Sequence, residues 1–207
     1  MSTSARFDAR DLARIAIFAA LIVALGTAMV PIPGGVPITG QTLGVMLAGI
    51  VLGARRGAMS VLVVLALAAV GLPVLTGGRG GLSVFVGPSA GYMFGWVAGV
   101  IVTGLIVHKG AQKLYAWRVI SGAIVGGILV VYLFGIPVQA LATGIALAPT
   151  ALSSMVFLPG DLAKVAVATA LSLALYRAYP PAFGEAFTSR KIAASIERED
   201  APAPSRV

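Results

Sequence analysis

The chain has no cysteine, a single histidine, and charged side chains at only 11% of its 207 residues. The lack of cysteine excludes disulfides, thiolate metal sites, cysteine-ligated Fe–S clusters and cysteine nucleophiles. One histidine, His108, cannot form a multi-histidine metal site, and beside Lys109 we expect it to be a solvated loop residue. A soluble domain usually has roughly 25% charged residues. This chain, which is 58% hydrophobic, therefore requires lipid as its solvent.

Long apolar runs take the place of the missing charge. A bilayer core of about 30 Å needs about 20 apolar residues per helix. We expect an all-α integral membrane protein with six transmembrane helices, the first of them starting near a capping Asp8 or Asp11. The expected helices cover residues 15–30, 42–53, 57–75, 92–107, 117–135 and 159–176.

A further apolar stretch, residues 136–156, contains Pro137, Gly144 and Pro149. Broken backbone at membrane depth is tolerated only where it is buried in protein or lines a cavity. We therefore expect a partly helical connection that is re-entrant or lies on the membrane surface. A seventh span here would conflict with the distribution of basic residues.

The basic residues occur at alternate ends of the expected helices. They are Arg6, Arg10, Arg14, Arg55, Arg56, Lys109, Lys113, Arg118, Arg177, Arg190, Lys191 and Arg198. The opposite loops carry only Arg79, so the positive-inside rule places both termini in the cytoplasm. The net charge of +8 then indicates contact with membrane lipid rather than nucleic acid. We expect a membrane domain over residues 1–184 and a polar, disordered cytoplasmic tail over residues 185–207.

The sixth expected helix begins with an unusual pair of charges. Asp161 is the only acidic residue between Asp11 and Glu185, and Lys164 follows it on the same helical face. Ionisable groups at membrane depth are costly and are candidates for a functional site. Two interpretations remain open: a ligand site facing an outward-opening pocket, or a structural pair in which Asp161 neutralises Lys164.

Two expected outer loops offer further candidates. After the first helix, Thr39, Gln41 and Thr42 can supply donors and acceptors on a constrained loop, or simply form a turn. The glycine-rich segment after the third helix lacks the Gly-Lys-Ser/Thr of a phosphate loop. Its Arg79 either attracts an anion or is solvated.

The first helix has an alanine at every fourth position, namely Ala16, Ala20, Ala24 and Ala28. Small residues with this spacing let membrane helices approach closely. The ridge therefore serves either to dock a partner subunit or to pack within this bundle.

Five segments, in this order, resemble the BioY family. They are residues 36–49 (VPITGQTLGVMLAG), 52–57 (LGARRG), 71–73 (GLP), 87–92 (GPSAGY) and 158–164 (LPGDLAK). BioY proteins are the biotin-specific substrate-binding components, or S components, of energy-coupling factor (ECF) transporters. The resemblance implies a six-helix S-component fold in the inner membrane of a prokaryote. It also implies high-affinity biotin uptake, with no enzyme activity and no cofactor.

The resemblance also implies partners and residue roles. The partners are a transmembrane coupling protein, which meets the alanine ridge, and a pair of cytoplasmic ATPases. Asp161 and Lys164 match the family's ligand contacts, and Arg79, Ser89 and Tyr92 lie where its other polar contacts arise. Lys164 and Arg79 both remain candidates for the biotin carboxylate. The alternatives are an S component for another small vitamin and a solitary proton-coupled carrier.

Overall fold

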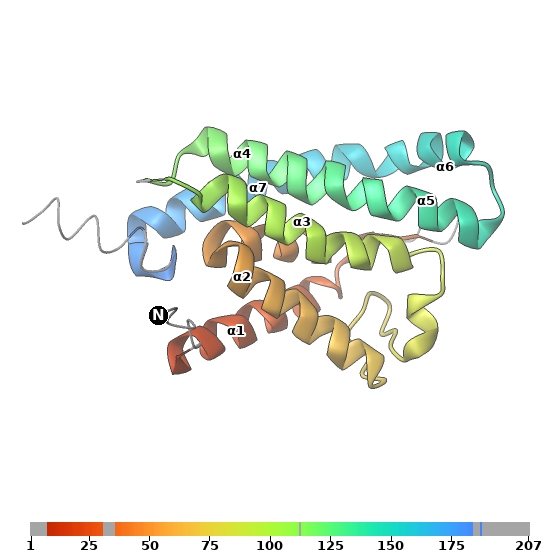
Figure 1. Cartoon of the computed structure of the whole chain (residues 1–207), viewed down its shortest axis with the longest axis horizontal. Helices are drawn as coiled ribbons and strands as arrows, with labels where there is room; N and C mark the ends of the chain where they lie inside the picture. Colours follow the sequence, from red (N-terminus) through yellow and green to blue (C-terminus); the bar gives the residue numbers. More distant parts are fainter. Residues whose placement is uncertain (1–7, 31–35, 112, 184–186, 188–207) are drawn as a thin grey trace, which may run out of the picture.

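A computed structural model describes residues 8–30, 36–111, 113–183 and 187, which form an almost wholly helical bundle (Figure 1). Its elements, in chain order, are α1 (Ala9–Leu25), β1 (Met29–Val30), β2 (Ile38–Thr39), α2 (Gln41–Ala69), η1 (Leu82–Phe85), α3 (Ala90–His108), α4 (Ala116–Ile124), η2 (Val125–Val130), α5 (Val131–Thr143), α6 (Leu147–Ser154), η3 (Met155–Phe157), α7 (Leu158–Ala178) and η4 (Pro180–Phe183). The predicted tail, residues 185–207, lies outside the described residues except for Phe187.

Helix α1 starts where its sequence predicts. The side chain of Asp8 caps it, since Oδ1 accepts a hydrogen bond of 2.7 Å from the backbone N–H of Asp11. The helix ends at Leu25, earlier than the predicted residue 30, and the chain then forms the short antiparallel pair β1–β2, in which Met29 faces Thr39. This pair returns the chain to the start of α2.

Helix α2 is broken at Gly53, which has a φ of 79° and a ψ of −178°. Only glycine adopts this conformation readily. An alanine Cβ at Gly57 would lie 2.9 Å from the carbonyl oxygen of Ala48, although nine residues of straight helix would separate them by about 13 Å. The two arms of α2 therefore fold back against each other. This agrees with the prediction of two helices on either side of residues 53–57, although the second arm ends at Ala69 and not at the predicted residue 75.

The fifth predicted helix is longer than expected. Elements α4, η2 and α5 form one continuous helix from Ala116 to Thr143, with a π-helical turn at Val125–Val130 and Pro137 inside it. The helix ends where Gly144 takes the left-handed conformation, with a φ of 70°. The predicted end at residue 135 is wrong, because membrane helices tolerate an internal proline when their surroundings compensate for the lost hydrogen bond.

Residues 136–156 therefore do not form a single separate connection. Their first part completes α5, and their last part, α6 and η3, leads directly into α7. Within the residues that the structure describes, four helical stretches are long and apolar enough to cross a bilayer: Gln41–Ala69, Ala90–His108, Ala116–Thr143 and Leu147–Ala178. Large apolar side chains on their outer faces are exposed, as at Leu133 (70%) and Leu152 (75%), which suits a surface covered by lipid.

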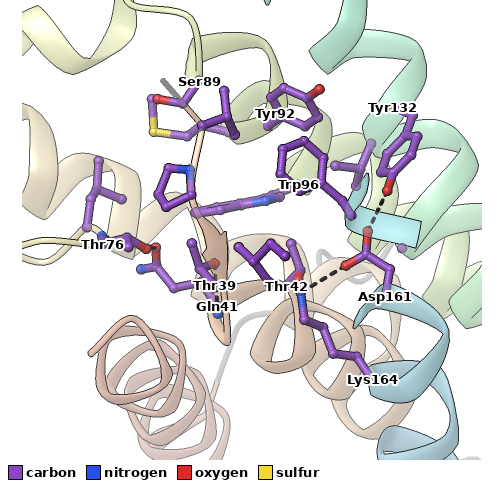
Figure 2. Close-up of a pocket in the computed structure, with 18 of the residues that line it drawn as sticks. Thr39, Gln41, Thr42, Thr76, Ser89, Tyr92, Trp96, Tyr132, Asp161 and Lys164 are labelled. Atoms are coloured by element: carbon purple, nitrogen blue, oxygen red, sulfur yellow. Dashed lines mark hydrogen bonds and ion pairs between the residues drawn. The ribbon is translucent and has the colours of Figure 1, made fainter. Parts of the chain in front are cut away.

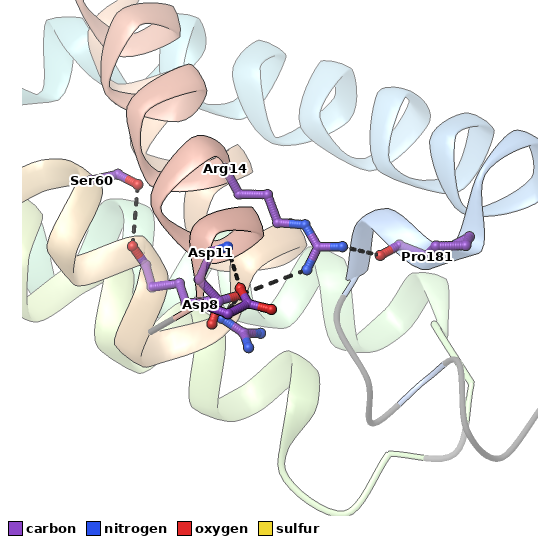
Figure 3. A network of polar contacts seen from close by, with 6 residues as sticks. Asp8, Asp11, Arg14, Ser60 and Pro181 are labelled. Carbon is purple, nitrogen blue, oxygen red and sulfur yellow. Dashed lines mark hydrogen bonds and ion pairs between the residues drawn. The ribbon is translucent and has the colours of Figure 1, made fainter. Parts of the chain in front are cut away.

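The start of α1, the α3–α4 loop and the end of α7 lie together at one end of the bundle (Figure 1). Figure 3 shows the polar network at this end. The Asp11 carboxylate lies 2.8 Å from Arg56 Nε and 3.9 Å from an Arg14 nitrogen, and Arg14 also donates to the Pro181 carbonyl at 2.9 Å. These contacts fix α1 against the turn of α2 and the segment after α7.

His108 belongs to this same end, and the expectation of a solvated loop residue is wrong. It is the last residue of α3, and its Nε2 lies 2.7 Å from the Ile50 carbonyl oxygen. Because a carbonyl only accepts, Nε2 donates this bond. The break at Gly53 leaves the last carbonyls of the first arm without helical partners, and His108 satisfies one of them.

Candidate functional site

The principal pocket opens at the opposite end of the bundle from the basic network. It encloses about 690 Å³ of space not occupied by atoms, its open mouth included. The pocket lies between α2, α3, α5 and α7 and is bordered by the segments before α2 and before η1. All eight residues that the sequence suggests for substrate binding line it: Thr39, Gln41, Thr42, Arg79, Ser89, Tyr92, Asp161 and Lys164.

The charged pair lies in this pocket, on the first turns of α7 (Figure 2). Pro159 starts the helix, and Asp161 near its N-terminus interacts favourably with the helix dipole. Lys164 Nζ donates to Asp161 Oδ1 at 2.8 Å and to Thr42 Oγ1 at 2.8 Å. The side chains of Lys164 and Asp161 are only 15% and 8% exposed, so the pair lies largely out of water.

Tyr132 holds the other oxygen of the carboxylate. Its hydroxyl donates a hydrogen bond of 2.7 Å to Asp161 Oδ2. The π-helical turn at Val125–Val130 comes directly before α5 and contains Gly127, which also lines the pocket. A π turn inserts an extra residue into a helix and re-aims the side chains that follow it. Here Val131 and Tyr132 are brought to the pocket wall.

Aromatic side chains make the apolar walls. The Tyr92 ring meets Tyr132 and Phe157 edge to face, at centroid distances of 6.3 Å and 6.4 Å. The Tyr92 hydroxyl donates to Gln139 Oε1 at 2.7 Å. Tyr92 therefore lines the pocket with its aromatic ring, while its hydroxyl is bonded to the protein. Trp96 lies in the middle of the lining in Figure 2, and its buried Nε1 has no hydrogen-bond partner among the described residues. An unpaired buried donor beside a pocket is available to a ligand.

The polar residues at the edges of the pocket differ in how many of their hydrogen-bonding groups are already used by the protein. Thr39 Oγ1 accepts from the backbone N–H of Gln41 at 3.2 Å, which leaves its own O–H as a donor. The Gln41 amide is 1% exposed and bonds to Val74 and Thr76 of the following loop. Arg79 is exposed at the mouth, and Ser89 lies at the start of α3 with no side-chain capping bond.

The alanine ridge lies away from the pocket, on the outer face of α1. Ala16, Ala20 and Ala24 are exposed there, while the opposite face of the helix buries Ile15, Ala19 and Ile22. Ala28 is exposed too, but the prediction that it continues the helical ridge is wrong, because α1 ends at Leu25. The exposed alanines therefore do not pack within the part of the bundle that the structure describes.

Sequence reasoning missed Tyr132 and Thr76 as members of the site. A signal for Tyr132 was present, because a tyrosine in the middle of an apolar run has a hydroxyl that needs a partner at membrane depth. Thr76 gave no such signal. It follows a Leu-Pro turn in a loop that reads as solvated, and only the tertiary fold buries it.

Comparison with known proteins gives one consistent result. The model of the BioY family matches residues 1–181. The chain is 49% identical over 179 residues to the biotin transporter BioY of Rhizobium etli, covering 83% of this chain and 95% of that protein. It is also 49% identical over 187 residues to the biotin transporter BioY of Rhodobacter capsulatus, covering 81% and 95%.

A solved structure is similar as well. The crystal structure of the S-component for biotin from an ECF-type ABC transporter superimposes with a TM-score of 0.77 at 32% identity. The match covers 86% of this chain and 95% of that one. The helical arrangement described above is therefore that of an S component.

Proposed function

The chain belongs to the BioY family, and from that premise we propose that it takes up biotin by binding it in the pocket at Asp161. Proteins of this family are transporters rather than enzymes. The chain is accordingly a multi-pass membrane protein of a prokaryote, and we propose the inner membrane as its location.

One observation supports biotin most directly: the hydrogen-bonding capacity that the charged pair has left over. An ionised carboxylate offers about four acceptor positions. Lys164 and Tyr132 each use one, on different oxygens, so each oxygen of Asp161 keeps a free position. The ureido ring of biotin carries two N–H donors that point away from each other, and the Asp161 carboxylate can accept from one of them in a strong charge-assisted bond.

The same pair also has a donor to spare. Lys164 has three N–H donors, of which Thr42 and Asp161 take two. The third can reach the ureido oxygen, so that the ring is held on both its donor and acceptor sides. The apolar parts of biotin would then contact the Tyr92, Trp96 and Phe157 walls, as in a pocket with few polar groups and many apolar ones.

We propose six membrane spans with both termini in the cytoplasm. The two arms of α2 count as two short spans, each shorter than α1, and α1, with 17 residues, reaches the lower limit for a span of full length. The polar network and the neighbouring ends of α3, α4 and α7 carry basic side chains, namely Arg14, Arg56, Lys109, Arg118 and Arg177. Exposed Trp117 and Tyr179 in the same region suit the membrane–water interface. The pocket then faces outward, and residues 185–207 would follow α7 on the cytoplasmic side.

We further propose that α1 docks a transmembrane coupling protein, which in turn works with a pair of cytoplasmic ATPases. The exposed alanine ridge supports this, because its methyl groups leave a shallow face on which a second helix can pack closely. The Asp11–Arg56 and Arg14–Pro181 contacts hold the base of α1 in a fixed position for that docking.

Calorimetry on the purified wild-type protein in detergent, with biotin as the titrant, tests the proposed function. We expect saturable binding of one biotin per chain, and no displacement by riboflavin or thiamine. Uptake of labelled biotin by cells that lack their own biotin transporter provides the second measurement. A well-folded protein that binds no biotin would refute the proposed function.

A further inference from the structure

Gln41 lines the pocket, but its polar atoms are engaged with the protein. Nε2 donates to the Val74 carbonyl at 3.1 Å, and Oε1 accepts from both the backbone N–H and the hydroxyl of Thr76, at 3.2 Å and 2.7 Å. With 1% of its surface exposed, the side chain is enclosed by these bonds. It links the first turn of α2 to a loop more than thirty residues later in the chain.

That loop carries Arg79, and its shape places the guanidinium. Leu75 and Arg79 pair through hydrogen bonds of 3.0 Å and 3.2 Å between their backbones. Arg79 Nε also donates to the Thr76 carbonyl at 3.2 Å. Thr76 is therefore held by Gln41 on one side and orients Arg79 on the other.

Helix α1 packs against Gln41 from behind. A Cβ added to Gly26 would lie 2.8 Å from Gln41 Nε2 and 2.9 Å from its Cδ, which is closer than a real contact allows. Gly26 itself has a φ of −69°, so alanine there meets no backbone strain. The glycine is required because the amide of Gln41 occupies the space beside it.

Arg79 is the cation best placed for an anionic group at the mouth of the pocket. Lys164 already faces the Asp161 carboxylate at 2.8 Å, whereas Arg79 is exposed and forms no ion pair with any described residue. A ligand whose ureido ring occupies Asp161 would extend its carboxylate toward the mouth.

Resting on the proposed function, we propose that Gln41 is a positioning residue rather than a ligand contact. Seated against Gly26, it holds the 74–79 loop and, through Thr76, orients Arg79 toward the carboxylate of bound biotin. Two residues that do not reach the ligand, Gly26 and Gln41, thereby set the preference for an acidic substrate.

The test compares biotin with biotin methyl ester, in which the carboxylate is masked. Calorimetry on the full chain would measure both affinities for wild type and for the variants Gln41→Ala, Thr76→Val, Gly26→Ala and Arg79→Met. We expect each variant to lower the affinity for biotin by about twofold to tenfold, the range that the loss of one net hydrogen bond gives. We also expect each variant to lower the ratio of biotin affinity to ester affinity. A purely structural defect would weaken both ligands alike and leave that ratio unchanged, which would overturn the proposal.

Rescue and coupling make the test specific. Thr76→Ser keeps the hydroxyl and should restore the wild-type ratio. In a Gln41→Ala background, Gly26→Ala should cause no further change in biotin affinity or in the ratio of biotin to ester affinity, because both changes act on the same amide. Gly87→Ala is the matched control, since a Cβ there meets no atom within 4 Å. If the double variant lost biotin affinity by the product of the two single losses, Gly26 and Gln41 would act independently, and the proposed contact between them would be contradicted.

The outcome separates this inference from the proposed function. If the wild-type protein binds neither ligand, the proposed function fails and the inference falls with it. If the wild-type protein binds biotin and its methyl ester equally well, biotin binding stands and the role of Arg79 and Gln41 is refuted.

Discussion

Replacing Asp161 by asparagine removes one charge while keeping the shape of the side chain. The carboxylate accepts from Lys164 and Tyr132 and retains one free acceptor position on each oxygen. The asparagine amide has a single oxygen with two acceptor positions, one of which Lys164 takes. The remaining position can still accept from a ureido N–H, but without charge assistance.

The size of the effect follows from this count. A hydrogen bond to a charged group contributes about 1.5–3 kcal/mol, and one between neutral groups about 0.5–1.5 kcal/mol. Weakening or losing this one charged bond costs about 1–3 kcal/mol, which corresponds to a dissociation constant about five to a hundred times higher. The variant also leaves the Lys164 ammonium without its counter-charge, so we expect lower thermal stability as well.

The protein supplies a closely matched control in Asp11. Both aspartates are 6% exposed, and each has a basic nitrogen at 2.8 Å, but Asp11 lies at the opposite end of the bundle. Calorimetry should therefore find biotin affinity within about threefold of wild type for Asp11→Asn, since changes at distant sites act independently. Asp161→Asn with unchanged affinity, or Asp11→Asn with the same loss, would refute the assignment of the binding site.

Three further outcomes are expected. Tyr132→Phe removes one hydrogen bond to Asp161 and should lower the affinity for biotin about tenfold, as measured by calorimetry; an unchanged affinity would exclude a role for that bond. Ala20→Leu places a bulky side chain on the exposed ridge and should abolish uptake in cells while binding in detergent persists; normal uptake would count against docking through α1. Gly53→Ala should lower the free energy of unfolding by about 1–3 kcal/mol through its positive φ alone, because its Cβ would meet His108 at an ordinary 3.6 Å. Equal stability in a thermal unfolding assay would contradict this last prediction.

The helices were predictable wherever the chain marks their ends chemically. Asp8 starts α1, the glycine and arginines at residues 53–57 turn α2, and Pro159 opens the first turn of α7. The charged pair was predictable for the same reason, because an acid and a base inside an apolar segment have few alternatives to each other. These features act over three or four residues and need no knowledge of the tertiary fold.

The features that sequence reasoning missed depend on partners far along the chain. Pro137 resembles a helix end, but the helix continues because the surrounding bundle supports it. His108 resembles a solvated residue until the break in α2 presents the Ile50 carbonyl to it. Gln41 looks like a free pocket amide until the loop at Thr76, 35 residues later, takes its hydrogen bonds.

The geometry predicts which substitutions in and beside α1 affect uptake and which affect binding. The ridge alanines are exposed on the outer face and line no part of the pocket, so enlarging them should impair docking alone. Gly26 follows the last residue of α1, one turn beyond the buried Ile22, and its added methyl would press on the Gln41 amide. Alanine at Gly26 should therefore alter biotin affinity while leucine at Ala20 does not. This contrast along one helix distinguishes a docking face from a general requirement for an undisturbed α1.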